Sequence, residues 1–214
     1  MNRTGIALAM ASFLMWGTFP LYWANTIAVP AFEVLSHRGF WIVPFLLVVI
    51  TWARMWPGVR EAFSRTNLPW LMVSAVLISI NWGVYVWAVA EQAVTEAALG
   101  YYLTPLLNVA AGMLLFGEQL SRLKVLALGI AGIGVLSVAL LVGSWPWFGL
   151  AVGFSFAAYS SARKKAKVEA IQGLTAESFL LFPIWAIYLW VWGDMKWVTT
   201  EPTAIWLVLG GAVT

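Results

Sequence analysis

The sequence predicts an all-α polytopic membrane protein. Of its 214 residues, 62% are apolar and only 10% are charged, whereas soluble domains carry about 25% charged residues because their surface must be hydrated. A spanning helix needs roughly 20 apolar residues, and runs of that kind recur along this chain. The composition therefore predicts about seven spans, with the lipid bilayer as the main partner, and excludes an ordinary soluble domain.

Apolar runs define the predicted spans and the start of one more. The first run is too long for the apolar core of a signal peptide and has no small-residue cleavage site, so we expect it to remain as a helix. The spans are expected at 5–26, 33–53, 70–91, 96–117, 121–142, 145–162 and 175–192, and an eighth begins near residue 203.

The basic residues predict the orientation of these spans. Lysines and arginines in short loops stay in the cytoplasm. Ten of the twelve fall in the N-terminus and in the second, fourth and sixth connections, against Lys196 alone in the other connections. We therefore expect a cytoplasmic N-terminus. This orientation signal also accounts for the net charge of +3, so no nucleic-acid partner is expected.

A weak internal repeat has an offset of about 143 residues. The pair Ser12-Phe13 recurs as Ser155-Phe156, and Glu33 recurs as Glu177. The sixth span thus restarts the pattern of the first, which predicts a repeat of five helices. Because an odd number of spans reverses the entry side of the second copy, the repeats should be inverted, as in many secondary transporters.

The repeat divides the chain into two expected domains. We expect 1–142 to form the first five-helix repeat and 143–214 to form an incomplete second one. Residues 203–214 are too short to cross a hydrocarbon core of about 30 Å. The rest of the eighth helix and two further helices are therefore expected beyond residue 214, giving a ten-helix carrier fold.

Three ionisable residues lie close together in the second span. Glu33 and His37 are four residues apart and share a helix face, and Arg38 lies deeper in the span. An arginine within a span normally faces a polar interior. We expect Arg38 to anchor an anionic or carbonyl group of a substrate, and Glu33 and His37 are candidates for proton coupling. In the structural alternative, Arg38 snorkels outward or pairs with Glu91 or Glu96.

A polar stripe runs along the third span. Ser74, Asn81 and Tyr85 fall on one side of the expected helix. In hydrocarbon such a face should turn toward another helix or toward water. Asn81 and Tyr85 are therefore candidates for the lining of a substrate cavity, and hydrogen bonding between helices is the alternative.

The fourth span carries a second set of cavity candidates. Tyr101, Thr104 and Asn108 follow helical spacing, and Pro105 removes one backbone hydrogen bond. A bend at such a proline marks a binding region or a gating hinge in some transporters. We assign these four residues to substrate binding or gating, with a static kink and interhelical hydrogen bonds as the alternative.

Small residues form one face of the fifth span. Ala127, Ala131 and Gly134 lie on that face, and small residues allow helix backbones to approach closely. This face is expected to pack between repeats or between two protomers, which makes a homodimer a possible assembly.

Two charged features have local explanations. Glu118 lies four residues before Arg122, and we expect these side chains to pair at the turn after the fourth span. The run Arg163-Lys164-Lys165 is expected to retain the sixth connection in the cytoplasm.

Stretches along the whole chain resemble one transporter family. These stretches are Trp16-Gly17 with Pro20 and Tyr22, Glu33 to Arg38 with Trp41, Asn81-Trp82 with Trp87-Ala88-Val89, Glu96 to Leu106, Gly117-Glu118, and Ser155-Phe156 to Glu169 with Pro183. They resemble the RarD-type permeases, named for chloramphenicol sensitivity, in the EamA family of the drug/metabolite transporter superfamily. The resemblance implies a ten-helix carrier of the bacterial inner membrane, with a central cavity between inverted repeats.

The resemblance also points to individual positions. It implies that His37, Arg38, Asn81, Tyr101 and Pro105 line the cavity or act in gating. A threonine at position 104 departs from the family pattern, which has asparagine before the proline. Related exporters handle amino acids and other small metabolites, so the resemblance does not specify a substrate.

We expect a secondary transporter for small metabolites, amino acids or drug-like compounds that works by alternating access. A seven-helix receptor or binding protein is one alternative, although retinal binding would require a lysine in the seventh span, which has none. An intramembrane enzyme is another, but the chain has no Gly-x-Ser-x-Gly elbow. Since the chain has no cysteine and one histidine, we expect no metal, cofactor or enzymatic activity.

Overall fold

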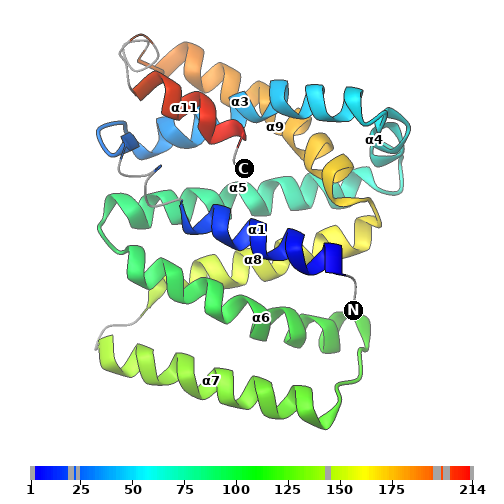
Figure 1. Ribbon diagram of the computed structural model, residues 1–214, viewed down its shortest axis with the longest axis vertical. Coiled ribbons are helices and arrows are strands. Elements are labelled where there is room, and N and C mark those ends of the chain that lie inside the picture. Colours follow the sequence, from blue (N-terminus) through cyan, green and yellow to red (C-terminus); the bar gives the residue numbers. More distant parts are fainter. Residues whose placement is uncertain are drawn as a thin grey trace.

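The computed structural model describes residues 3–18, 22, 25–142, 146–194, 199 and 203–212, and within these ranges it is built of helices and their connections (Figure 1). Pro20, Lys196 and the side chain of Trp16 lie outside the described residues. The helices are α1 (Arg3–Gly17), α3 (Ala31–Trp52), α4 (Trp56–Ala62), α5 (Leu68–Ala90), α6 (Val94–Phe116), α7 (Arg122–Val142), α8 (Trp147–Ala166), α9 (Ala170–Trp192) and α11 (Thr203–Ala212).

The structure confirms a helical multi-pass membrane protein. Four helices, α3, α5, α6 and α9, are long and apolar enough to cross a bilayer, with 22 or 23 residues each. At about 1.5 Å per residue, each extends over roughly the thickness of the hydrocarbon core. The α7 and α8 helices have 21 and 20 residues and correspond to the predicted spans 121–142 and 145–162.

Two predicted boundaries differ from the structure. The first helix, α1, ends at Gly17 instead of continuing to residue 26. Pro20 follows shortly after Gly17 in the sequence, and a proline cannot continue the helical hydrogen-bond ladder. The connection after α3 contains the short helix α4, which hydropathy does not detect because it is only 7 residues long.

The helices form two groups, visible as the upper and lower halves of Figure 1. In the upper group, α3 packs extensively against α9 and α11. In the lower group, α8 packs extensively against α5 and α6. Contacts between the groups, from α5 to α3 and α9, are less extensive. Each group combines helices from both of the repeats that the sequence predicts.

The N-terminal part of α3 is enclosed by other helices. Residues 33–39 are buried on every face of the helix, as expected for a helix surrounded by neighbours. Glycines permit this close packing: a Cβ on Gly39 would lie 2.3 Å from the Trp185 ring of α9, and a Cβ on Gly211 would lie 2.4 Å from the backbone of Trp41.

The lower group is held by an equally close backbone contact. A Cβ on Gly100 of α6 would lie 2.5 Å from the carbonyl oxygen of Gly149 of α8. Glu96 of α6 accepts a 2.8 Å hydrogen bond from the backbone N–H of Phe148, which otherwise has no partner in the first turn of α8. These contacts fix the register of α6 against α8.

Helix α7 lies at the edge of the molecule next to α6 (Figure 1). Ala127, Ala131 and Gly134 are exposed, and a Cβ placed on Gly129 or Gly134 would meet no atom of a neighbouring helix among the described residues within 4 Å. The face is thus open in the single chain. Its use in a homodimer stays a prediction.

Candidate functional site

The candidate site is centred on Arg38, which is only 6% exposed. Its guanidinium carbon lies 5.1 Å from the centroid of the Trp82 ring of α5, within the range of a cation–π interaction. Tyr22, Tyr85 and Tyr101 are all close enough to interact electrostatically with the guanidinium. Residues far apart in the sequence therefore form an aromatic enclosure around one buried cation.

A row of aromatic rings extends this enclosure toward α8. The Tyr85 and Tyr101 centroids are 5.8 Å apart, because the short connection between α5 and α6 brings the end of one helix close to the start of the other. The Tyr101 ring in turn lies 6.4 Å from Phe156, and Phe156 lies 5.6 Å from Tyr159. The wall is apolar in its ring faces and carries hydroxyl groups at its edges.

Helix α11 closes the other side of Arg38. A Cβ on Gly210 would lie 2.4 Å from the Tyr22 hydroxyl oxygen and 3.0 Å from Cγ of Arg38. Only a residue without a side chain fits this position. The buried cation therefore lies between the two helix groups, with α11 and α3 on one side and Trp82, Tyr85 and Tyr101 on the other.

The two predicted proton-coupling residues have separate surroundings. Oε1 of Glu33 accepts a 2.7 Å hydrogen bond from the backbone N–H of Asp194, which ties the connection after α9 to the start of α3. His37 is 5% exposed, and its Nδ1 has no hydrogen-bond partner among the described residues. Their role in proton coupling stays untested.

The polar stripe of α5 is divided among different partners. Nδ2 of Asn81 donates to the carbonyl oxygen of Val152 at 2.9 Å and to the Ser155 hydroxyl at 3.0 Å. Ser74 donates to Glu177, and Tyr85 faces Tyr101. Asn81 thus joins α5 to α8, which is the interhelical hydrogen bonding that the sequence offered as an alternative.

The α6 candidates do not gather at Arg38 as a set. The Thr104 hydroxyl donates to the carbonyl oxygen of Gly100 within its own helix, at 3.0 Å. Pro105 lies inside α6, which continues to Phe116. Asn108 is half-buried. Of the predicted residues on α6, only Tyr101 interacts with Arg38, and the gating role of the others stays a prediction.

The suggested carboxylate partners of Arg38 bind elsewhere. Glu96 accepts the Phe148 N–H, and Glu91 accepts a 3.2 Å hydrogen bond from the Trp87 indole of its own helix.

A second buried charge cluster was not identified as a site from the sequence. Glu177 of α9 is 1% exposed. Its Oε1 accepts a 2.5 Å hydrogen bond from Ser74 and lies 3.4 Å from Nε of Arg163, and its Oε2 accepts a 3.4 Å hydrogen bond from Tyr159. The internal repeat, which matches Glu177 with Glu33, is the sequence feature that points to this residue.

The basic residues at the end of α8 have different partners. Arg163 points inward to Glu177, with its side chain 13% exposed. Lys164 pairs with Glu118 at the end of α6. The expected pairing of Glu118 with Arg122 is therefore wrong. Because Gly117 ends α6 in the left-handed conformation, at a φ of 65°, the chain turns there and Glu118 lies against α8.

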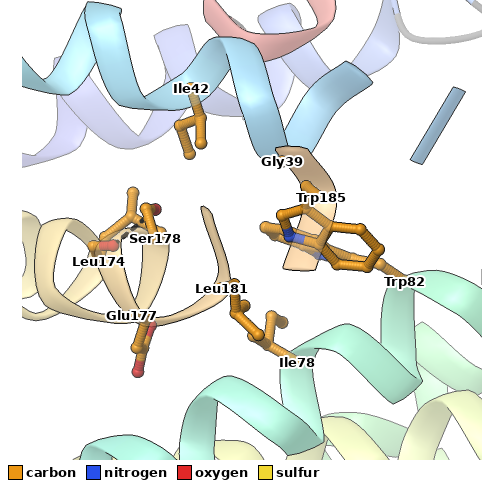
Figure 2. A pocket seen from close by; sticks show the side chains of 9 residues that line it. All are labelled: Gly39, Ile42, Ile78, Trp82, Leu174, Glu177, Ser178, Leu181 and Trp185. Carbon is orange, nitrogen blue, oxygen red and sulfur yellow. Dashed lines mark hydrogen bonds between the residues drawn. The ribbon is translucent and has the colours of Figure 1, made fainter. Parts of the chain in front are cut away.

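A small pocket, with a volume of about 10 Å³, lies between the Trp82 ring and Glu177 (Figure 2). Trp82, which stacks on Arg38, and Trp185 lie at one end, and Glu177 and Ser178 lie at the other. The remaining lining residues are Gly39, Ile42, Ile78, Leu174 and Leu181. Among the described residues, no group of three or more His, Asp and Glu side chains could hold a metal ion.

Comparison with known proteins identifies relatives over most of the chain. Residues 3–140 match the EamA-like transporter family. The chain is 37% identical over 212 residues to the "Uncharacterized transporter YojE" of Bacillus subtilis, covering 97% of this chain and 71% of that protein. It is 39% identical over 194 residues to "Protein RarD" of Escherichia coli, covering 90% and 66%.

A more distant relative carries a drug-related name. The chain is 29% identical over 210 residues to the "Chloramphenicol-sensitive protein RarD" of Pseudomonas aeruginosa, covering 96% of this chain and 70% of that protein. No solved structure shows significant similarity to the chain.

Proposed function

We propose that this chain, which belongs to the EamA-like transporter family, is a secondary transporter of the inner membrane that carries small metabolites, amino acids or drug-like compounds. Its relatives are named as transporters or RarD proteins. The observation that carries the proposal is the aromatic enclosure around Arg38, a buried cation at the boundary between two helix groups.

The surroundings of Arg38 favour a substrate that combines an acid group with an apolar body. A guanidinium presents planar N–H donors that fit a carboxylate with two parallel hydrogen bonds. The hydroxyls of Tyr85 and Tyr101 offer further donors, and the Trp82 and Phe156 rings offer apolar surface. We therefore propose amino acids and other small carboxylates as the substrate class.

Alternating access is proposed to occur at the boundary between the helix groups. The Arg38 enclosure, the pocket and the Glu177 cluster all have walls from both groups. Contacts within each group include close backbone approaches, at Gly211 and at Gly100, and contacts between the groups are less extensive. A rocking movement of α3, α9 and α11 against α5, α6 and α8 would open Arg38 to one side of the membrane at a time.

The proposal includes the repeat architecture. The domains 1–142 and 143–214 are proposed as inverted repeats, with the N-terminus in the cytoplasm. Each helix group then contains elements of both repeats, because α8 of the second repeat lies between α5 and α6, and α3 of the first lies with α9 and α11. Because each group contains helices of both repeats, a movement of one group against the other would involve both repeats.

Uptake into liposomes tests the proposed function. The complete gene product is reconstituted and supplied with a panel of labelled amino acids and small carboxylates, with and without an imposed pH gradient. We expect saturable uptake of at least one compound, lost in Arg38→Ala and partly retained in Arg38→Lys. Arg122→Ala is the matched control, because Arg122 is exposed at the start of α7. Absence of uptake, or equal uptake by Arg38→Ala, would overturn the proposal.

A further inference from the structure

We propose that Glu177 binds the proton that couples transport to the pH gradient, with Arg163 balancing its charge in the ionised state. The inference rests on the proposed transport function. It depends on three features of the Glu177 cluster: a carboxylate oxygen with a single long contact among the described residues, a counter-cation with partners of its own, and a pocket that is also lined by Trp82 of the Arg38 enclosure.

The two carboxylate oxygens of Glu177 have different surroundings. Oε1 receives both the Ser74 hydroxyl at 2.5 Å and the Arg163 Nε at 3.4 Å. Oε2 has only the long 3.4 Å contact with the Tyr159 hydroxyl among the described residues. A proton can therefore add to Oε2 without displacing a donor from Oε1. The step forms one O–H bond and breaks no other bond in the protein.

Arg163 does not depend on Glu177 for all of its partners. Its Nη2 donates to the carbonyl oxygens of Glu169 and Ala170, both at 3.3 Å, and only Nε faces the carboxylate. Removing one member of a buried ion pair is normally costly, because the other charge loses its compensation. The backbone carbonyls reduce that cost here, so Glu177 can become neutral while Arg163 remains in place.

Three helices, α3, α4 and α5, pack against α9 near Glu177 in addition to α8. Helix α3 contributes Gly39 and Ile42, and α5 contributes Ser74 and Ile78. Helix α4 approaches α9 through Ala62, which packs on Ala176. The charged and titratable groups that act on Glu177 come from α8, and among the described residues they are Arg163 and Tyr159.

The hydroxyl partners of Glu177 suit both of its protonation states. The Ser74 and Tyr159 hydroxyls at Glu177 can donate to a carboxylate or accept from a carboxylic acid. Glu177 therefore has partners suited to both states.

The small pocket lies next to both the proton site and the substrate site. Glu177 and Trp82 line the same pocket, and the Trp82 ring lies against Arg38. Figure 2 shows these two side chains at opposite ends, with Ile78 and Leu181 between them. Neutralising Glu177 weakens its attraction to Arg163 across the boundary between α8 and α9, and its partner Ser74 lies on α5, the helix that also carries Trp82.

Infrared difference spectroscopy of the complete protein in lipid tests the inference without any substrate. Acidification should produce C=O stretching bands from all the carboxyl groups that take up protons, and difference spectra between variants separate them. We expect one of these, the Glu177 band, to be lost in Glu177→Gln and retained in Glu33→Gln, a matched removal of another buried glutamate. In Ser74→Ala the band should shift, because the carboxyl group loses a hydrogen-bond donor.

Retention of the band in Glu177→Gln, its loss in Glu33→Gln, or the absence of any titrating band would overturn the inference. If Glu177→Gln does not fold, Ser74→Ala decides the question, and an unshifted band overturns it. Once a substrate is known, Glu177→Gln should exchange it across the membrane but lose its accumulation under a pH gradient. Failure of all transport would overturn the proposed function and leave the infrared result intact.

Discussion

The Arg38 enclosure and the Glu177 cluster bury opposite charges in different ways. Glu177 has a counter-cation and two hydroxyls from neighbouring helices. Arg38 lies against the Trp82 ring, and three tyrosines are close enough to interact with it electrostatically. The hydroxyl partners of Glu177 can serve a carboxylate or a carboxylic acid, whereas the guanidinium of Arg38 fits an acid group with two parallel hydrogen bonds. The difference agrees with the roles proposed for them, proton binding at Glu177 and substrate binding at Arg38.

The largest effect is expected when the ion pair of the Glu177 cluster is broken. Arg163→Ala leaves a buried carboxylate without its counter-cation, which should lower the free energy of unfolding by about 3–5 kcal/mol. Denaturant unfolding of the detergent-solubilised protein measures the change. The double variant Arg163→Ala with Glu177→Gln should lose less, and equal losses in the single and double variants would contradict the assignment.

A smaller loss is expected at the helix that closes the Arg38 enclosure. In Gly211→Ala, the new Cβ meets the backbone of Trp41 at 2.4 Å, so α11 must shift from α3 at a cost of about 1–3 kcal/mol. Gly129→Ala on α7 is the control, because no described atom of a neighbouring helix lies within 4 Å of its Cβ. Thermal unfolding compares the two variants, and similar melting temperatures would argue against the close approach of α11.

The stacking of Arg38 on Trp82 should contribute less again. Trp82→Leu removes the ring beneath the guanidinium, which is expected to weaken substrate binding by about 1 kcal/mol, or roughly fivefold in KM. Trp82→Phe should retain part of the effect, since a phenyl ring also attracts cations. Concentration-dependent uptake gives both values. An unchanged KM in Trp82→Leu would mean that the Trp82 ring does not contribute to substrate binding.

The smallest effect should come from the ion pair at the ends of α6 and α8. The Glu118 and Lys164 side chains are 49% and 51% exposed, and exposed pairs contribute at most about 1 kcal/mol. Glu118→Gln should therefore lower stability much less than Arg163→Ala in the same denaturant titration. A comparable loss would mean that exposure does not distinguish the two ion pairs.

Hydropathy predicted the long helices of this protein because each apolar run had the length of a span. It did not predict α4, which is shorter than any span, and it extended α1 past Gly17 because the following residues are also apolar. The spacing of apolar and polar residues along the chain assigns a residue to a helix and to one of its faces. It does not determine which neighbouring helix that face contacts.

The candidate site shows the same limit. Arg38, Tyr85 and Tyr101 were each proposed from the rarity of polar residues in a span, and the structure brings them together. The sequence predicts only an orientation role for Arg163, because it precedes two lysines. Its contact with Glu177 depends on how α8 and α9 pack. The Thr104 hydroxyl bonds within its own helix, and its place in a cavity stays a prediction.

The position of α8 between α5 and α6 also sets an order for synthesis. Asn81 donates to the carbonyl oxygen of Val152, which lies 71 residues later in the chain. At about 5–20 residues per second, a ribosome needs roughly 4–14 s to add that length. Until then the amide side chain must be accommodated by the insertion machinery or by water, so α5 and α6 complete their packing only after the second half of the chain has begun to enter the membrane.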